Sequence, residues 1–244
     1  EMGDYPNGVD GHGKHCGVIR FLEDTDGDGR YDRSTVFLDG VNFPNGVMPW
    51  RKGVLVSAAP EFFYAEDSDG DGKADVRKTL FKGFVEGNQQ HRVNGFEYGL
   101  DNWLYAANGD SGGEILSLLT GKKTSISGRD LRFRPDDGAF EPTAGQTQFG
   151  RRRDDWGNWF GNNNSFWLLH FFLPEHYLQR NPHLAIKTTR RNLANYPDST
   201  RVFPISRLMQ RFNDIGMAGH VTSACGTGLN RDELFGPEFA RAAF

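Results

Sequence analysis

The same acidic loop occurs twice in this chain, between short runs of apolar residues. The first copy spans residues 24–32 and the second spans 67–75. Each carries aspartate at loop positions 1, 3, 5 and 9, and glycine at position 6, where the chain must turn sharply. Four carboxylates within nine residues repel one another unless a cation lies among them. The duplicated spacing therefore predicts a bound metal ion, and an all-oxygen ligand set favours calcium.

These loops differ from EF-hands, because position 12 holds Thr35 in one copy and Lys78 in the other instead of glutamate. Strand-like runs flank each loop, at 18–22 and 35–38 and at 62–65 and 79–81. We therefore expect two β-hairpins, each closed by one calcium ion. The alternative is a plain turn, since Asp and Gly favour turns through local hydrogen bonds. The predicted ligands are the carboxylates of Asp24, Asp26, Asp28 and Asp32 with the carbonyl of Arg30, and the carboxylates of Asp67, Asp69, Asp71 and Asp75 with the carbonyl of Lys73.

The repeat continues beyond the loops. With an offset of 49 residues, Asn45-Gly46 matches Asn94-Gly95, Leu55 matches Leu104 and Glu61 matches Asp110. A period of about 40 to 50 residues built from short strands is typical of propeller blades. We read a weaker third pass from 114 to 160 and the start of a fourth near His220. The predicted fold is all-β: a partial β-propeller, six-bladed when complete, with Asp-rich calcium hairpin loops.

Residues 1–244 are expected to form a single propeller domain, and the chain reads as a fragment of a longer protein. The segment 167–219 departs from the blade pattern, and its prolines and mixed periodicity predict an insertion between blades. A short helix is expected within it, around 174–179. Glycine is abundant, at 31 of 244 residues, and 20 phenylalanines and 5 tryptophans can fill the spaces between sheets. This composition fits a turn-rich β-domain.

Charge and hydropathy exclude some classes of partner. The formal net charge is −4, which argues against nucleic acid, and the run 151–153 of three arginines is followed directly by two aspartates. The longest apolar stretch, 166–173, is far shorter than the roughly 20 residues that span a bilayer, so no transmembrane segment is expected. Cys16 and Cys225 could pair or remain thiols. Calcium loops without a carboxylate at position 12 suit high external calcium, so we expect an extracytoplasmic location, periplasmic or secreted, with membrane association only through other regions.

A resemblance to a known family rests on residues 90–110. The histidine His91, followed by Gly99-Leu-Asp101, Tyr105 and Gly109-Asp110, resembles the active-site blade of soluble quinoprotein glucose and sorbosone dehydrogenases. The stretches 20–110, 148–160 and 223–226 are also similar to the propellers described as membrane-bound dehydrogenases in planctomycete-type bacteria. The resemblance covers most of the chain.

The resemblance implies hydride transfer from a sugar or alcohol to pyrroloquinoline quinone. His91 would be the general base and Asp110 would orient its ring, since imidazole suits proton transfer near neutral pH. Gln90, Arg152 and Arg153 would contact the quinone, with the arginines holding a carboxylate. Gln90 stands where the glucose enzymes carry an acidic residue. A haem domain or cytochrome outside this sequence would accept the electrons. The alternative is a non-enzymatic, calcium-stabilised propeller that binds carbohydrate or protein partners, with His91 and Asp110 as a structural pair.

Overall fold

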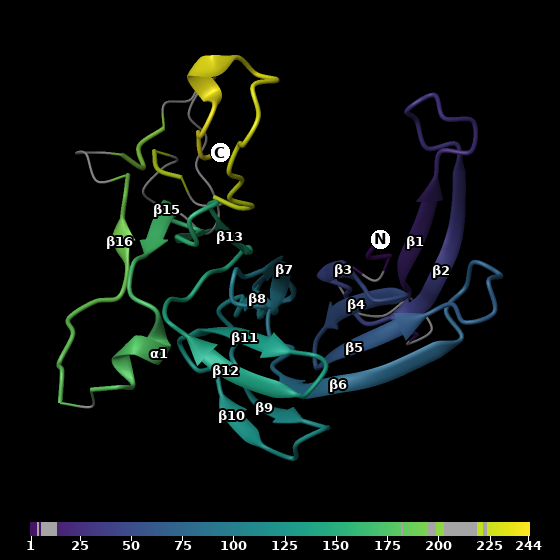
Figure 1. Ribbon diagram of the computed structural model, residues 1–244, viewed down its shortest axis with the longest axis horizontal. Coiled ribbons are helices and arrows are strands. Elements are labelled where there is room, and N and C mark those ends of the chain that lie inside the picture. Colours follow the sequence, from purple (N-terminus) through teal and green to yellow (C-terminus); the bar gives the residue numbers. More distant parts are fainter. Residues whose placement is uncertain (4, 6–13, 182, 195–198, 203–218, 222–223) are drawn as a thin grey trace.

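The chain forms four antiparallel sheets arranged in an arc, as seen in the computed structural model, which describes residues 1–3, 5, 14–181, 183–194, 199–202, 219–221 and 224–244 (Figure 1). The expected all-β class is confirmed. In chain order the elements are β1 (Gly17–Glu23), β2 (Arg33–Val41), β3 (Gly46–Trp50), β4 (Gly53–Ala58), β5 (Glu61–Glu66), β6 (Val76–Phe84), η1 (Gln89–His91), β7 (Asn94–Tyr98), β8 (Leu104–Ala107), β9 (Gly113–Ser117), β10 (Lys123–Ser125), β11 (Asp130–Arg134), β12 (Ala139–Thr143), β13 (Arg151–Arg153), β14 (Trp159–Asn163), β15 (Phe166–Phe171), α1 (Glu175–Leu178), β16 (Arg191–Asn192) and η2 (Pro237–Phe239).

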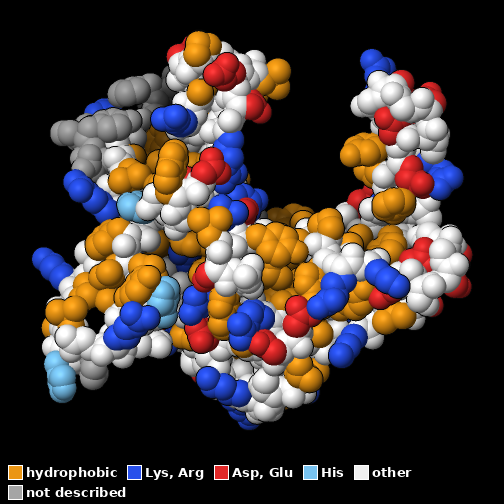
Figure 2. Space-filling view, in the orientation of Figure 1, with side chains coloured by type: hydrophobic (Ala, Val, Ile, Leu, Met, Phe, Trp, Pro, Cys, Tyr) orange, Lys and Arg blue, Asp and Glu red, His pale blue; other side chains and the backbone are white. Residues whose placement is uncertain are grey.

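Each sheet is built mostly from strands that follow one another in sequence. The first sheet is the hairpin β1–β2, and the second contains the meander β3–β4–β5–β6. The hairpin β9–β10 adds to the outer edge of this second sheet through β6. The third sheet has the order β7–β8–β11–β12, and the fourth has the order β13–β14–β15–β16. Figure 2 shows a hollow between the β1–β2 hairpin and the C-terminal residues, at the open side of the arc.

Both acidic loops lie at the ends of antiparallel hairpins, as expected. The first joins β1 to β2, where Glu23 is opposite Arg33, and the second joins β5 to β6, where Glu66 is opposite Val76. The hairpins hold each loop at a free end of the molecule, away from the inner strands (Figure 1).

A separate apolar core lies between each pair of neighbouring sheets. Successive side chains of a strand point to opposite faces of its sheet, so one strand can contribute apolar residues to the cores on both sides. In β5, Phe63 packs in the core shared with β1–β2, whereas its neighbour Phe62 packs in the core shared with the third sheet. There Phe62 stacks on Phe84 at 4.1 Å and meets Phe96 edge-on at 5.0 Å. A smaller cluster around Tyr105 and three residues of the fourth sheet, Trp159, Leu169 and Phe171, joins the third sheet to the fourth.

The inner strands of three sheets lie side by side at the centre of the arc, where β7 contacts both β3 and β13 (Figure 1). Glycine permits this approach. Gly95 has φ +67°, and a Cβ there would lie 2.5 Å from the Cα of Gly150. The repeated Asn-Gly pair recurs at a strand start, since Gly46 is the first residue of β3 and Gly95 is the second residue of β7. The 49-residue register does not extend to Glu61 and Asp110, because Glu61 begins β5 whereas Asp110 lies in the turn between β8 and β9. The predicted third pass was wrong in its pairing, because its segments belong to β9, β11 and β14, in three different sheets.

The fourth sheet extends into the segment 167–219, which we expected to be an insertion. Strand β15 pairs with β14 over most of its length, and β16 pairs with β15. The short helix predicted within 174–179 is confirmed as α1. Residues 182, 195–198 and 203–218 of that segment, and 222–223 of the predicted fourth pass, lie outside the described residues. Cys16 and Cys225, both described, form no disulfide with each other. Among the described residues, no helix is long and apolar enough to cross a membrane.

Candidate functional site

A group of polar side chains surrounds His91, at the end of the 3-10 turn η1. Asn88 caps this turn by accepting a hydrogen bond from the backbone N–H of Gln90 at 2.9 Å. The chain then turns into β7. His91 was expected to begin an inner strand, and it lies three residues before one.

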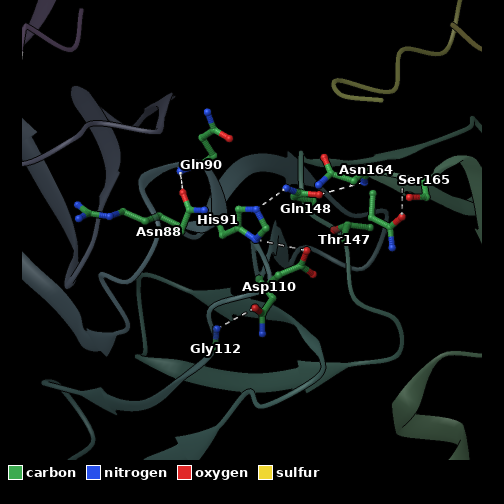
Figure 3. A network of polar contacts seen from close by, with 12 residues as sticks. Asn88, Gln90, His91, Asp110, Gly112, Thr147, Gln148, Asn164 and Ser165 are labelled. Carbon is green, nitrogen blue, oxygen red and sulfur yellow. Dashed lines mark hydrogen bonds and ion pairs between the residues drawn. The ribbon is translucent and has the colours of Figure 1, made fainter. Parts of the chain in front are cut away.

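His91 lies between a carboxylate and an amide (Figure 3). Its Nδ1 is 3.8 Å from Oδ2 of Asp110, and its Nε2 is 3.0 Å from Nε2 of Gln148. The side chains of His91 and Asp110 are each 29% exposed. The structure therefore brings together the two residues predicted to form the catalytic pair.

Gln148 is the contact that the sequence did not predict. It is fully buried, and its Oε1 accepts a hydrogen bond from the backbone N–H of Asn164 at 3.0 Å. Since Oε1 is occupied by a donor, the amide NH₂ is the group that meets the ring of His91. The Nε2 of His91 then accepts this hydrogen bond, and Nδ1 carries the ring proton on the side of Asp110. This arrangement fixes both the tautomer and the orientation of the ring.

A buried polar layer supports this site from below. Asp130 is fully buried, and its carboxylate accepts hydrogen bonds from the backbone N–H groups of Asn108 and Thr147, both at 2.9 Å, and from the Thr147 hydroxyl at 2.8 Å. Burial raises the pKa of the Asp130 carboxyl, and the guanidinium of Arg151, 3.3 Å away, opposes that rise. The backbone carbonyl of Thr147 in turn accepts from Gly109, the residue before Asp110. The layer thus ties the turn that carries Asp110 to the segment that carries Gln148.

A cavity of about 490 Å³ has the two chain neighbours of His91, Gln90 and Arg92, in its lining, but not His91 itself. We call it the axial cavity. Its lining combines N-terminal residues, residues that flank His91 in sequence, residues at or just before the starts of β3, β7 and β13, and two residues from later in the chain: Met2, Tyr5, Pro44, Asn45, Gln89, Gln90, Arg92, Asn94, Phe149, Asn164 and Cys225. Most of its polar groups are amides, so it offers both donors and acceptors. Gln90, one of the predicted quinone contacts, lines it and donates to the Tyr5 hydroxyl at 3.0 Å.

Arg152 and Arg153 are held elsewhere. Arg152 forms an ion pair with Glu97 at 3.2 Å, and Arg153 donates to the backbone carbonyl of Tyr98 at 2.5 Å. Both partners lie at the end of β7 that is remote from His91. Among the described residues that lead into β13, Gln148 is the one whose side chain contacts His91.

Each acidic loop gathers three of its four predicted carboxylates. One oxygen from each of Asp24, Asp26 and Asp28 lies within 4.8 Å of the others, and Asp67, Asp69 and Asp71 form the same cluster in the second loop. The two loops also have the same pattern of internal hydrogen bonds. Asp24 accepts from the backbone of Gly27 and Gly29 at 2.7 and 2.9 Å, and Asp67 accepts from Gly70 and Gly72 at 2.7 and 2.8 Å. Figure 2 shows acidic side chains gathered at the free ends of these hairpins.

The fourth aspartate of each loop has another role in this structure. Asp32 accepts hydrogen bonds from the backbone and hydroxyl of Thr25, and Asp75 accepts the same pair from Ser68. Position 9 of calcium loops often reaches the ion through water. The carbonyls of Arg30 and Lys73 remain predicted ligands. Their backbone N–H groups donate to Asp28 and Asp71 at 2.8 Å.

The loop geometry favours charged carboxylates. Hydrogen bonds from Gly29 and Gly72 lower the pKa of Asp24 and Asp67, respectively, below the usual range. The hydroxyls of Thr25 and Ser68 lower the pKa of Asp32 and Asp75 in the same way. Exposed carboxylates that are clustered and held ionised form a suitable ligand set for a hard cation.

Comparison with known protein families matches residues 1–244 to a family described as Domain of unknown function (DUF7133). Among curated proteins, none matches this chain. The family description names no reaction.

Proposed function

The chain belongs to the DUF7133 family over residues 1–244, and we propose that it is a calcium-stabilised β-propeller segment that binds a sugar or another small polyol in its axial cavity. The observation that carries this proposal is the gathering of five amide side chains in the lining of that cavity: Asn45, Gln89, Gln90, Asn94 and Asn164. A ligand with many hydroxyl groups can both donate to and accept from such a lining.

Sheet order supports the propeller. Propeller blades are four-stranded antiparallel sheets arranged around a central channel. The third and fourth sheets have four strands each, and the second contains a four-stranded meander. Their first strands, β3, β7 and β13, meet at the centre, and neighbouring sheets share apolar cores face to face. We propose that the arc corresponds to part of a six-bladed wheel.

Two calcium ions would stabilise the hairpins, one in each loop. The duplicated clusters of three carboxylates and the lowered pKa of Asp24 and Asp67 support this proposal. An ion bound only by the folded loops stabilises the folded chain. Calcium is abundant outside the cytosol, so the proposal includes an extracytoplasmic location.

A second candidate is a dehydrogenase, favoured by the contact of His91 with Asp110. In that reaction His91 would take the proton of a substrate hydroxyl, while a quinone supplied the redox chemistry. The residues present fit pyrroloquinoline quinone poorly. Arg152 and Arg153 are engaged by Glu97 and Tyr98, and the lone pair of His91 Nε2 is engaged by Gln148. These residues therefore leave no free group to hold the quinone carboxylates, and they assign no role to a haem partner that would receive its electrons.

Calorimetry with D-glucose and D-sorbitol, in millimolar calcium, tests the binding proposal. Gln90→Ala should weaken binding about tenfold, the usual cost of one or two lost hydrogen bonds. Gln179→Ala, which removes an exposed amide at the end of α1, is the matched control. Affinity that is equal in both variants and wild type would contradict an axial site. Adding the quinone and a redox dye to the same samples tests the second candidate, which requires sugar-dependent dye reduction that is lost in His91→Ala.

A further inference from the structure

A second cavity lies between the third and fourth sheets and is separate from the axial cavity. We call it the inter-sheet cleft. It measures about 330 Å³, and its walls come from the β7–β8 turn, the β13–β14 turn and α1. The two sets of lining residues share no member. The cleft is therefore a separate binding space.

Aromatic rings dominate the mouth of the cleft. Trp156, in the β13–β14 turn, is 70% exposed, and Tyr177, in α1, is 53% exposed. Deeper in the cleft, Trp159 is buried and lies against Tyr105 with ring centroids 4.1 Å apart. Large exposed rings beside a cavity are costly to hydrate, and they offer flat surfaces to an apolar ligand face.

The charged groups of the cleft already have counter-charges. Asp101 is paired with Arg132 at 3.0 Å, and Arg151 is paired with Asp130 at 3.3 Å. Burial is the largest cause that lowers the pKa of His176, and the nearby positive charges of Arg132 and Arg180 lower it further. This ring is therefore neutral at pH 7. A charged ligand would lose its hydration here and find no unpaired opposite charge. The cleft therefore favours a neutral ligand.

Unused hydrogen-bonding capacity remains in the lining. Arg151 is fully buried, and its Nε is without a hydrogen-bond partner among the described residues. A buried donor of this kind costs free energy unless an acceptor reaches it. Burial raises the pKa of Tyr105 to about 12, so its hydroxyl stays protonated and donates to Asp101 Oδ2 at 2.9 Å. The Asp101 carboxylate has about four acceptor sites, and its three hydrogen bonds leave capacity for one more.

We propose that the inter-sheet cleft binds a neutral sugar ring. One face of a pyranose is lined by C–H groups and can stack on Trp156 or Tyr177, while its hydroxyls can donate to the Asp101 carboxylate. This combination of a flat apolar face with edge donors and acceptors matches the lining, and the volume suits one or two rings. Sugar binding in the inter-sheet cleft does not require sugar binding in the axial cavity.

Tryptophan fluorescence and calorimetry test the proposal, with methyl β-D-glucopyranoside and cellobiose as probes. Trp156→Ala removes an exposed ring and should weaken the cleft affinity at least about tenfold. Tyr31→Ala, an equally exposed ring in the first acidic loop, is the matched control and should leave binding unchanged. Gln90→Ala, in the axial cavity, should also leave the cleft affinity unchanged, which separates this site from the axial one.

Charged probes decide between ligand classes. Glucuronate presents an anion and choline presents a quaternary ammonium, and both should bind at least about tenfold more weakly than the neutral glycoside. Tighter binding of either charged probe would overturn the assignment to a neutral sugar. Binding of no probe, or binding that survives Trp156→Ala and Tyr177→Ala together, would overturn the site itself.

Discussion

The amide of Gln148 meets the ring of His91 at 3.0 Å, although the two residues are 57 positions apart in the chain. The contact joins the turn before β7 to the segment before β13, and so it links two sheets at the centre of the molecule (Figure 3). It also occupies the nitrogen through which His91 would take a substrate proton. Any reaction that uses this nitrogen as a base first requires the amide of Gln148 to move.

Replacing Gln148 with glutamate tests this hydrogen bond. A carboxylate can only accept, so Nε2 of His91 must then carry a proton while Nδ1 keeps its own beside Asp110. We expect Nε2 of His91 to carry a proton in Gln148→Glu but not in wild type, as nitrogen-15 NMR of the imidazole reports. His183, exposed beyond α1, is the internal control and should give the same nitrogen-15 shifts in both proteins. Unchanged nitrogen-15 shifts of His91 would mean that Gln148 does not determine its proton arrangement.

Removing calcium should destabilise the protein. An ion at a hundred times its dissociation constant adds about 2.7 kcal/mol to the free energy of unfolding for each site. We expect excess EDTA to lower the melting temperature measured by calorimetry. Asp26→Asn or Asp69→Asn should each reproduce part of that decrease, because each affects one loop. Asp39→Asn, on the exposed side of β2, is the control. A melting temperature that does not respond to EDTA would contradict the calcium sites.

Acid should destabilise the loops even without calcium. The pKa of Asp24 and Asp67 is lower in the folded chain than the usual value of about 4. A lowered carboxyl pKa stabilises the folded state above pH 4, and this stabilisation is lost as the pH falls through the folded-state pKa. We expect the melting temperature in EDTA to decrease below about pH 4. In the double variant Asp24→Asn with Asp67→Asn, this decrease should be smaller than in wild type. An equal decrease in both proteins would exclude these two carboxyl groups as its cause.

The sequence predicted the parts of the fold that local chemistry determines. The acidic hairpins and the repeated Asn-Gly strand starts follow from turn residues and alternation, which act over a few positions. The run at 114–119 was expected to belong to a third blade, and the pairing of β9 with β6 was missed, because that pairing depends on packing between sheets and has no local signature.

The candidate site was predicted only in part, because contacts between distant segments leave no local pattern. His91 and Asp110 were identified because residues 90–110 resemble the active-site blade of quinoprotein dehydrogenases. Gln148 and Asp130 could not be identified, because their partners are brought to them only by the fold. Alternation in β13 also separates three identical residues: Arg151 points into the core, whereas Arg152 reaches Glu97. A one-residue change in register reverses such an assignment.

Adding a methyl group at the centre of the arc should be costly. Gly95→Ala forces alanine to φ +67° and brings its Cβ against Gly150, so we expect a loss of roughly 1–3 kcal/mol or more in urea unfolding. Gly128→Ala is a matched control, because Gly128 has φ +68° and no atom within 4 Å of the added carbon. The difference between the variants measures the clash between β7 and β13 apart from backbone strain. Equal losses would mean that the inner strands do not pack as closely as they do here.

Breaking the buried ion pair beneath the site should cost more than removing both of its charges. Asp130→Asn keeps an acceptor for the backbone N–H groups of Asn108 and Thr147 but leaves the buried Arg151 without a counter-charge. We expect this variant to lose about 3–5 kcal/mol in urea unfolding. Adding Arg151→Met removes the uncompensated charge and places an apolar chain among Tyr105, Trp159 and Phe171, so the double variant should recover part of the loss. A double-mutant cycle measures the coupling between the two residues. Strictly additive losses would show that the stability of this layer comes from the hydrogen bonds of Asp130 and owes nothing to its pairing with Arg151.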